Sequence, residues 1–258
     1  MKVIFSDMDG TLIFSNKRIK DTDEVFSVER YKEKDVSFMS PYQFYLIRYL
    51  TSVGLLIPTT ARTEEELLRV DIVNDFNLNT YITSNGGKIH FEGKIDEEYD
   101  KEISEYVSKL NNHPKKVQSD IIGIVKKNNL IVNNIKLIPD LYVMVRFEDI
   151  ADVSYFDAYL NEIKSEYTVY ITGKKLYIVP QDITKERAVE FMISKYYRNS
   201  KTVGMGDTNM DFNFLKKTTY SLAPGHINFT DSNHELSFVS KKTNIDASEE
   251  LLELAILY

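Results

Sequence analysis

Two kinds of apolar pattern alternate along this chain. Short, nearly continuous apolar runs predict buried strands, and they lie at residues 3–5, 53–58, 80–83 and 201–203. Longer segments in which apolar residues recur every three or four positions predict amphipathic helices, and they lie at about residues 41–50, 64–76, 184–197 and 248–257. Strands that alternate with helices form a parallel sheet with helices on both faces. The predicted fold class is therefore α/β, with a doubly wound parallel sheet.

Capping and turn residues sharpen some of these boundaries. Residues 40–43 (SPYQ) and 63–66 (TEEE) have the pattern of capping boxes, the first with proline at the first helical position. Such boxes predict that helices begin there. A small hairpin is predicted over residues 88–95, with its turn at Glu92 and Gly93.

The middle of the chain has a different pattern. Its predicted elements are helices at about residues 100–110 and 153–167, an apolar-periodic segment at about 117–132, and strands at 142–147, 168–172 and 175–179. Helices mixed with antiparallel strands interrupt the simple strand–helix alternation here. We therefore expect residues 97–180 to form an inserted, smaller α/β domain, and residues 1–96 and 181–258 to form the main domain.

Composition excludes several classes of protein. The 258 residues, 43% hydrophobic and 28% charged, suffice for one large or two modest domains. A net charge of -7 argues against nucleic-acid binding, and no stretch approaches the roughly 18 apolar residues of a membrane span. Asp7 interrupts the first apolar run too early for a signal peptide. The absence of cysteine excludes disulfides and is compatible with a reducing cytosol, so a cytoplasmic location is expected.

Asp7 and Asp9 follow the first predicted strand directly. Gly10 lets the chain turn and bring both carboxylates toward one point. That point lies at the carboxyl end of a parallel strand, where open α/β sheets bind ligands. Carboxylate oxygens suit a hard cation such as Mg²⁺, and a carboxylate can act as a nucleophile. The alternative is an ordinary turn with two solvated aspartates, because Asp and Gly are common in turns.

Four short motifs together resemble those of the haloacid dehalogenase (HAD) superfamily, and they occur in that family's order. The first is DMDGTL at residues 7–12, the second TTAR at 59–62, the third Lys185, and the fourth GMGDTNMD at 204–211. Ala61 stands where the family has glycine, and Met210 stands where it has asparagine. Methionine cannot donate the hydrogen bond of asparagine, and losing such a partner near a metal costs about 10–100-fold in affinity or activity.

The resemblance implies a Rossmann-like HAD core with an inserted α/β cap of the C2 type, as in Cof-like and sucrose-phosphatase-like members. It implies Asp7 as the nucleophile and Asp9 as the general acid and base. It implies Mg²⁺ as the cofactor, held by Asp7, by the backbone carbonyl of Asp9 and by Asp207. Thr60 and Lys185 would bind the phosphate.

Asp211 and the segment at residues 15–39 each leave two interpretations open. Thr208 and Asp211 have capping-box spacing, so Asp211 either caps a helix or supports the metal ligands from behind, and both roles are compatible. The segment is longer than expected between the first two motifs. Its residues 24–30 and 36–39 alternate well enough for a hairpin, which is either a flap beside the nucleophile or an ordinary surface excursion.

Substrate-binding residues are weakly indicated. Arg62 and Asn85 follow predicted strands of the main domain near the expected site, and Arg146 and Lys174 lie in the inserted domain. For Arg146 and Lys174, base rates favour a solvated surface charge over substrate contact.

The resulting hypothesis is a Mg²⁺-dependent phosphomonoester hydrolase that forms an aspartyl-phosphate intermediate. Its partner would be a small phosphorylated metabolite such as a sugar phosphate, and neither nucleic acid nor membrane is expected. One alternative is a phosphotransferase or phosphomutase of the same superfamily. Another is a regulatory binding protein with weakened catalysis, which Met210 makes conceivable.

Overall fold

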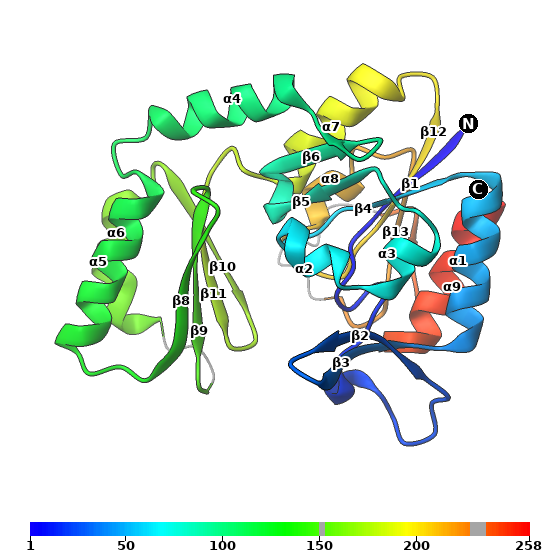
Figure 1. Cartoon of the computed structure of the whole chain (residues 1–258), viewed down its shortest axis with the longest axis horizontal. Coiled ribbons are helices and arrows are strands. Elements are labelled where there is room, and N and C mark those ends of the chain that lie inside the picture. The colour runs from blue at the N-terminus through cyan, green and yellow to red at the C-terminus, as the bar shows by residue number, and fades with distance from the viewer. Residues whose placement is uncertain (150–152, 228–235) are drawn as a thin grey trace. The chain divides into compact units, whose positions relative to one another are not determined.

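The computed structural model describes residues 1–149, 153–227 and 236–258, which divide into two compact units (Figure 1). Unit 1 comprises Met1–Asp96 and Thr184–Tyr258, and unit 2 comprises Glu97–Ile183. None of the helices in the described ranges is long and apolar enough to cross a membrane.

Unit 1 contains a five-stranded sheet in which every neighbouring pair is parallel. The strand order is β14-β13-β12-β1-β4. The strands are β1 (Lys2–Ser6), β4 (Leu55–Pro58), β12 (Lys201–Met205), β13 (Tyr220–Ala223) and β14 (Phe238–Val239). The predicted α/β class is confirmed, although β13 and β14 are not among the predicted strands. In this order the carboxyl ends of β4, β1 and β12 lie next to one another at one edge.

Helices cover both faces of this sheet because neighbouring residues of a strand point to opposite sides. The helices of unit 1 are α1 (Pro41–Val53), α2 (Glu64–Leu68), α3 (Asp71–Asp75), α7 (Lys185–Tyr196), α8 (Phe212–Leu215) and α9 (Asn244–Leu257). Ile4 belongs to the apolar cluster that includes α1 and α9. Phe5 instead meets the ring of Tyr197, at the end of α7, edge to face at 6.4 Å between centroids. The doubly wound architecture follows from this alternation.

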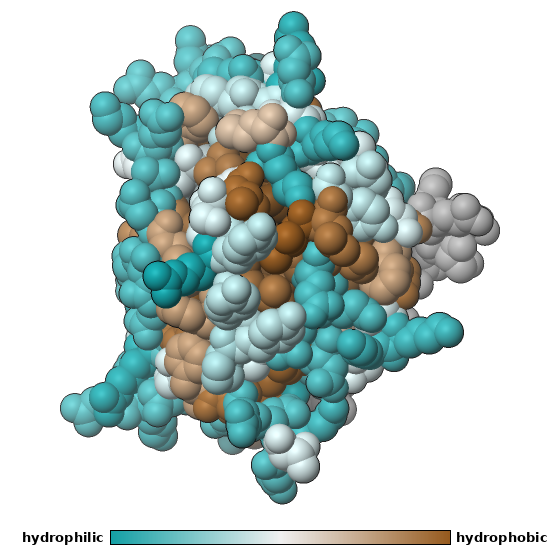
Figure 2. All heavy atoms as spheres, turned by 90° about the vertical axis from the view of Figure 1, so that its right-hand side faces the viewer, coloured by the Kyte–Doolittle hydropathy of each residue, from teal (hydrophilic) through white to brown (hydrophobic). Residues whose placement is uncertain are grey.

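The outer side of α1 and α9 forms the face seen in Figure 2, where apolar spheres run along the middle and hydrophilic ones lie around them. Exposed residues here include Tyr45, Tyr49 and Val53 of α1 and Leu257 of α9. Tyr42 is also exposed, and its hydroxyl donates to Glu253 of α9 over 2.8 Å. Apolar atoms contribute more than half of most protein surfaces, so this exposure is ordinary.

Both predicted capping boxes are present. Ser40 accepts a hydrogen bond from the backbone of Gln43, and Thr63 accepts one from that of Glu66, with the reciprocal bonds also formed. The continuous helix predicted over residues 64–76 is wrong, because it divides into α2 and α3. At the division Val70 adopts an extended conformation and pairs with Glu29, which lies outside the helix.

Two hairpins complete unit 1. The predicted hairpin within residues 15–39 is confirmed as β2 (Phe26–Tyr31) and β3 (Lys34–Met39), and its turn residues Lys32 and Glu33 both have positive φ. A one-turn helix, η1 (Asn16–Arg18), precedes it. The predicted hairpin at 88–95 is confirmed as β6 (Lys88–Phe91) and β7 (Lys94–Ile95), paired with β5 (Tyr81–Thr83), which leads into η2 (Ser84–Gly86).

Unit 2 is an antiparallel four-stranded sheet packed against helices. Its sheet has the order β10-β11-β9-β8, with β8 (Val132–Ile138), β9 (Tyr142–Phe147), β10 (Tyr167–Thr172) and β11 (Lys175–Pro180). Its helices are α4 (Glu97–Ser108), α5 (Pro114–Lys127), η3 (Ser154–Phe156) and α6 (Asp157–Ile163). The apolar cluster includes Val117 and Ile121 of α5 with Val143 and Val145 of β9.

The sequence predicted two elements of unit 2 inaccurately. The apolar-periodic segment at 117–132 ends early, because α5 stops at Lys127 and Asn129 adopts φ 50 before the strand β8 begins. Left-handed conformations of this kind end helices, and Asn tolerates them well. The helix predicted at 153–167 is the shorter α6, since Tyr167 already belongs to β10.

Candidate active site

Three of the predicted site residues lie directly beyond neighbouring strands. Asp7 follows β1, Thr60 lies two residues beyond β4, and Asp207 lies two residues beyond β12. The strand pairing continues past the named strands, because the Asp7 amide donates to the Met205 carbonyl over 2.8 Å. Lys185 is the first residue of α7, after the N-cap Thr184. The parallel sheet therefore brings the first, second and fourth motifs to one edge.

Gly10 makes the turn after the first motif possible. It has φ +92, a conformation that side chains with a Cβ rarely adopt. A Cβ at this position would lie 2.2 Å from an Arg18 nitrogen and 2.3 Å from Asp207 Oδ2. Glycine therefore lets the backbone lie directly against the fourth motif and the segment at residues 15–39, which is called the inserted segment below.

Asp7, Asp207 and Asp211 form a buried carboxylate cluster. One oxygen of each lies within 4.8 Å of the others, and all three residues are at most 6% exposed. Burial raises the pKa of Asp7 well above its ordinary value; Lys185 opposes this rise, while Asp211 and Asp207 add to it. Three adjacent carboxylates repel one another, so the site favours a cation among them.

Lys185 supplies one such cation. Its Nζ lies 2.5 Å from Asp7 Oδ1 and 2.5 Å from Asp211 Oδ1, and the side chain is buried. Burial lowers the pKa of Lys185, but the carboxylates of Asp211 and Asp7 outweigh it and raise the pKa above its ordinary value. Lys185 is therefore a fixed positive charge next to the predicted nucleophile.

The donor set also fits a hard divalent cation. Asp207 Oδ1 is buried and has no hydrogen-bond partner within the part of the chain that the structure describes. Such an oxygen needs a partner, and a cluster of carboxylate oxygens is what Mg²⁺ prefers. Asp7 and Asp207 would hold the ion. The side chain of Asp9 pairs with Arg62, which leaves its backbone carbonyl for the predicted ligand role.

Asp211 supports this arrangement from behind. Its Oδ2 accepts the Asp207 amide at 3.2 Å, the Thr208 amide at 2.9 Å and the Thr208 hydroxyl at 2.7 Å. The bond from the Thr208 amide is one of the two bonds of the predicted capping box, but Thr208 is not the N-cap, because α8 begins at Phe212 and its N-cap is Asp211. Met210 lies in the turn before α8 rather than on a helix.

Arg18 and His226 are additional basic groups at this site that the sequence did not indicate. Arg18 Nη1 lies 2.9 Å from Asp207 Oδ2, and His226 Nε2 lies 3.3 Å from the same oxygen. Arg18 Nη1 also lies 3.1 Å from His226 Nε2. Arg18 comes from η1 in the inserted segment, and the unusual length of that segment was its only sequence signal.

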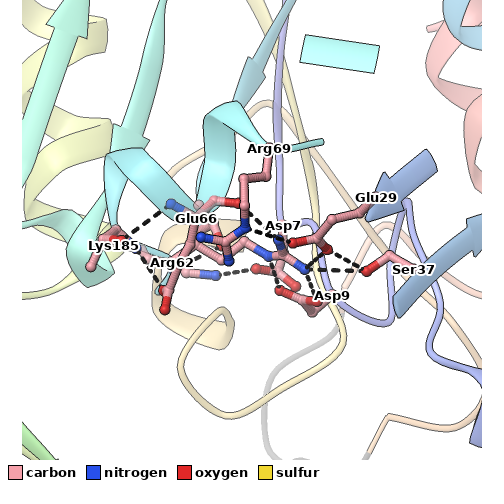
Figure 3. Close-up of polar contacts among 10 residues, drawn as sticks. Asp7, Asp9, Glu29, Ser37, Arg62, Glu66, Arg69 and Lys185 are labelled. Atoms are coloured by element: carbon pink, nitrogen blue, oxygen red, sulfur yellow. Dashed lines mark hydrogen bonds and ion pairs between the residues drawn. The ribbon is translucent and has the colours of Figure 1, made fainter. Parts of the chain in front are cut away.

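The side chain of Asp9 pairs with Arg62 and is not part of the carboxylate cluster (Figure 3). Arg62 Nε donates to Asp9 Oδ2 at 2.6 Å, and Nη2 donates to Asp9 Oδ1 at 2.8 Å. Nη2 also donates to Glu29 of β2 at 2.9 Å. Burial lowers the pKa of Arg62, but its pairing with Asp9 and Glu29 outweighs burial and raises that pKa. Arg62, a predicted substrate-binding residue, thus bridges two carboxylates here.

Thr60 and Asn85 lie in connected turns of unit 1. Thr60 is buried, and its hydroxyl accepts the Arg62 amide at 3.1 Å. Asn85 is also buried. Its backbone N–H donates to the Thr60 carbonyl at 3.0 Å, and its φ is 56. Ala61 is not among the described residues with positive φ, so alanine in the position of the family's glycine causes no backbone strain there.

Arg146 and Lys174 lie in unit 2. Arg146 is exposed on β9, where its register partner on β11 is Lys175. Lys174 donates to the carbonyl of Glu148, and its Nζ lies 3.5 Å from a carboxylate oxygen of Asp149. Their assignment to substrate binding stays a prediction.

Comparisons with known proteins agree with the resemblance to the haloacid dehalogenase superfamily. A family model described as haloacid dehalogenase-like hydrolase matches residues 99–244. A search of curated proteins finds no match. Similar solved structures include a haloacid dehalogenase-like hydrolase from Bacteroides thetaiotaomicron, which is 15% identical over 98% of each chain with a TM-score of 0.63.

Two other similar structures carry phosphatase names. The sucrose-phosphatase from Synechocystis, solved with sucrose and phosphate, is 14% identical over 98% of this chain and 97% of its own, with a TM-score of 0.63. A sugar phosphatase of HAD subclass IIB is 14% identical over 100% of both chains, with a TM-score of 0.65. At these identities the solved structures establish a shared fold.

Proposed function

Because the chain belongs to the haloacid dehalogenase-like hydrolases, we propose that it is a Mg²⁺-dependent phosphatase acting on a small phosphorylated metabolite. The observation that carries the proposal is the buried cluster of Asp7, Asp207 and Asp211, in which the ammonium group of Lys185 pairs with Asp7 and Asp211. A phosphate dianion needs positive charge beside a nucleophile, and this cluster supplies both a fixed cation and oxygen ligands for a second one.

Asp7 is the proposed nucleophile. Its carboxylate oxygen attacks phosphorus as the bond from phosphorus to the leaving oxygen breaks, which gives an aspartyl-phosphate and an alkoxide. Lys185 and the hydroxyl of Thr60 bind oxygens of the transferring group. Mg²⁺ bound by Asp7, Asp207 and the carbonyl of Asp9 would neutralise charge on the phosphate oxygens.

Asp9 is the proposed general acid and base. It protonates the leaving alkoxide in the first step. In the second step the carboxylate of Asp9 takes a proton from the water that attacks phosphorus, which releases phosphate and regenerates Asp7. General acid–base catalysis of this kind contributes roughly 10²–10⁴-fold.

The proposed division of labour follows the two units. Unit 1 carries every residue of the proposed chemistry, and unit 2 would contact the leaving group. The names of two structural neighbours, a sucrose-phosphatase and a sugar phosphatase, favour a sugar phosphate as the substrate class. Arg146 and Lys174 of unit 2 are the proposed contacts to the sugar or to a second anionic group.

The test is phosphate release from a panel of phosphorylated metabolites, with Mg²⁺ and with excess EDTA. Activity should require the metal. Asp7→Asn should lower turnover by more than tenfold, because an amide is a poor nucleophile and a poor ligand. Asp246→Asn, which changes an exposed carboxylate on α9, is the matched control and should leave turnover unchanged.

Full activity in EDTA would contradict the metal role, and a tenth or more of wild-type activity in Asp7→Asn would contradict the aspartyl-phosphate route. Transfer of phosphate to an added sugar in preference to water would indicate a phosphotransferase instead.

A further inference from the structure

Glu29 is a buried carboxylate that the proposed mechanism does not use. It lies on β2 in the hairpin of the inserted segment and is only 3% exposed. Ser37 of β3 donates to Glu29 Oε2 at 2.6 Å. Arg62 lies 2.9 Å from the same oxygen, and Arg69 lies 3.5 Å from the other one. Burying an unpaired carboxylate costs free energy, so these three partners stabilise Glu29 in its buried position.

Arg62 connects Glu29 to the proposed acid and base. Its guanidinium donates to both oxygens of Asp9 and to Glu29, and Nη1 donates to the carbonyl of Glu66 at 3.0 Å. The Arg62 side chain is 13% exposed, whereas that of Asp9 is 58% exposed. A guanidinium presents its donors in a rigid, planar fork, so the residues that fix Arg62 also fix the plane of the Asp9 carboxylate.

We propose that Glu29 is a positioning residue for the acid–base step. This proposal rests on the proposed phosphatase function. Glu29 and Ser37 hold one edge of the Arg62 guanidinium, and the other edge holds the carboxylate of Asp9 in one orientation. The hairpin β2–β3 thereby takes part in proton transfer to the leaving alcohol, although none of its side chains is assigned to the reacting phosphate.

The charge of Glu29, and not only its shape, matters for this role. Hydrogen bonds between an ionised acceptor and a guanidinium are shorter and roughly twice as strong as neutral ones. Glutamine at position 29 would keep the size of the side chain but would hold Arg62 with a neutral oxygen. Arg62 and the partly exposed Asp9 would then sample several orientations, and proton transfer depends steeply on such placement.

The choice of substrate separates positioning of the acid from a general structural role. An alkyl phosphate has a basic leaving group that needs the proton from Asp9. In 2,4-dinitrophenyl phosphate the leaving phenolate is stable without it. The measurement is kcat/KM for both esters in wild type and in Glu29→Gln, at saturating Mg²⁺, with thermal unfolding as the check on folding.

We expect Glu29→Gln to lower kcat/KM at least tenfold for the alkyl phosphate, mainly through kcat, and less than threefold for the dinitrophenyl ester. Ser37→Ala should give a smaller loss with the same preference, and it serves if Glu29→Gln fails to fold. Glu33→Gln, in the exposed turn of the same hairpin, is the matched control and should change neither value. In an Arg62→Ala background, Glu29→Gln should not change the ratio of the two values further.

Two results would overturn the proposal, and they differ from failure of the proposed function. Equal losses for both esters in the folded variants would make Glu29 a merely structural residue. An effect of Glu29→Gln on the ratio that persists in the Arg62→Ala background would show that Glu29 does not act through Arg62. If wild type releases phosphate from neither ester with Mg²⁺, the proposed function itself fails, and this proposal fails with it.

Discussion

Replacing Lys185 with methionine should destabilise the metal-free protein strongly. The ammonium group lies 2.5 Å from both Asp7 and Asp211, and all three side chains are buried. Methionine keeps the length and the apolar stem of the side chain but leaves two carboxylates without their shared cation. Removing one partner of a buried ion pair costs about 3–5 kcal/mol. For a chain of this size that corresponds to a fall in Tm of roughly 6–20 °C.

The pH dependence of this loss tests its cause. Burial raises the pKa of Asp7 well above its ordinary value, so this group stabilises the fold below its unfolded pKa of about 3.9 and the stabilisation is lost as pH rises through the folded pKa. Lys185 opposes that rise. Lys185→Met should therefore raise the pKa of Asp7 further, and the variant should lose more stability at pH 7 than at pH 5.

The assay is urea unfolding in EDTA at both pH values, repeated with Mg²⁺. Mg²⁺ should restore more stability to Lys185→Met than to wild type, because a divalent cation replaces the missing charge among the carboxylates. Lys217→Met is the matched control. Lys217 is half-exposed, pairs with Glu186 and Glu190 at 3.1 and 2.8 Å, and should contribute at most about 1 kcal/mol. A loss below about 1 kcal/mol for Lys185→Met at pH 7 would refute the reasoning.

Three further predictions concern the metal and the substrate. Met210→Asn should tighten Mg²⁺ binding with little change in KM, because it adds a hydrogen-bond donor to the turn between Asp207 and Asp211; equal or weaker binding in a calorimetric titration would contradict this. Arg18→Gln should also tighten Mg²⁺ binding, by about tenfold, because it removes a positive charge 2.9 Å from Asp207; thermal shifts against Mg²⁺ concentration measure it independently of activity. Arg146→Ala and Lys174→Ala should lower kcat/KM for a large natural substrate far more than for p-nitrophenyl phosphate, and equal losses would remove them from the substrate-binding set.

The sequence predicted those elements whose apolar period is regular and whose ends carry specific caps. Helix α1 begins at Pro41 because Ser40 and Gln43 form a capping box that is visible in the sequence. Strand β8 was missed because its residues, VNNIKLI, mix polar and apolar positions without a clear period. The predicted helix at 64–76 divided because Val70 pairs with Glu29, a contact 41 positions away that no local pattern contains.

In the candidate site, too, contacts between residues far apart in the sequence could not be predicted from local patterns. The resemblance to the HAD motifs implied that Asp7, Thr60 and Asp207 lie together, and the structure brings them together because residues that follow parallel neighbouring strands share one edge of the sheet. Arg18 and Asp207 are separated by 189 positions, and Arg62 and Glu29 by 33. Those pairs depend on where the inserted segment folds back, and its sequence indicated a hairpin without indicating which side chains face the site.

The charges around the carboxylate cluster explain why Arg18, which the sequence did not indicate, matters for the site. The motifs supply two cations: Lys185, which lies beside Asp7 and Asp211, and Arg62, which pairs with Asp9. The carboxylate cluster is strongly repulsive in a buried site without metal. Arg18, which lies outside the motifs, supplies a further cation beside Asp207 Oδ2. Asp207 Oδ2 is thereby paired in the absence of metal, while Asp207 Oδ1 stays available as a ligand for the proposed divalent cation. We therefore expect the positive charge of Arg18, in the segment at residues 15–39, to lower the affinity for the proposed metal, and Arg18→Gln tests this expectation.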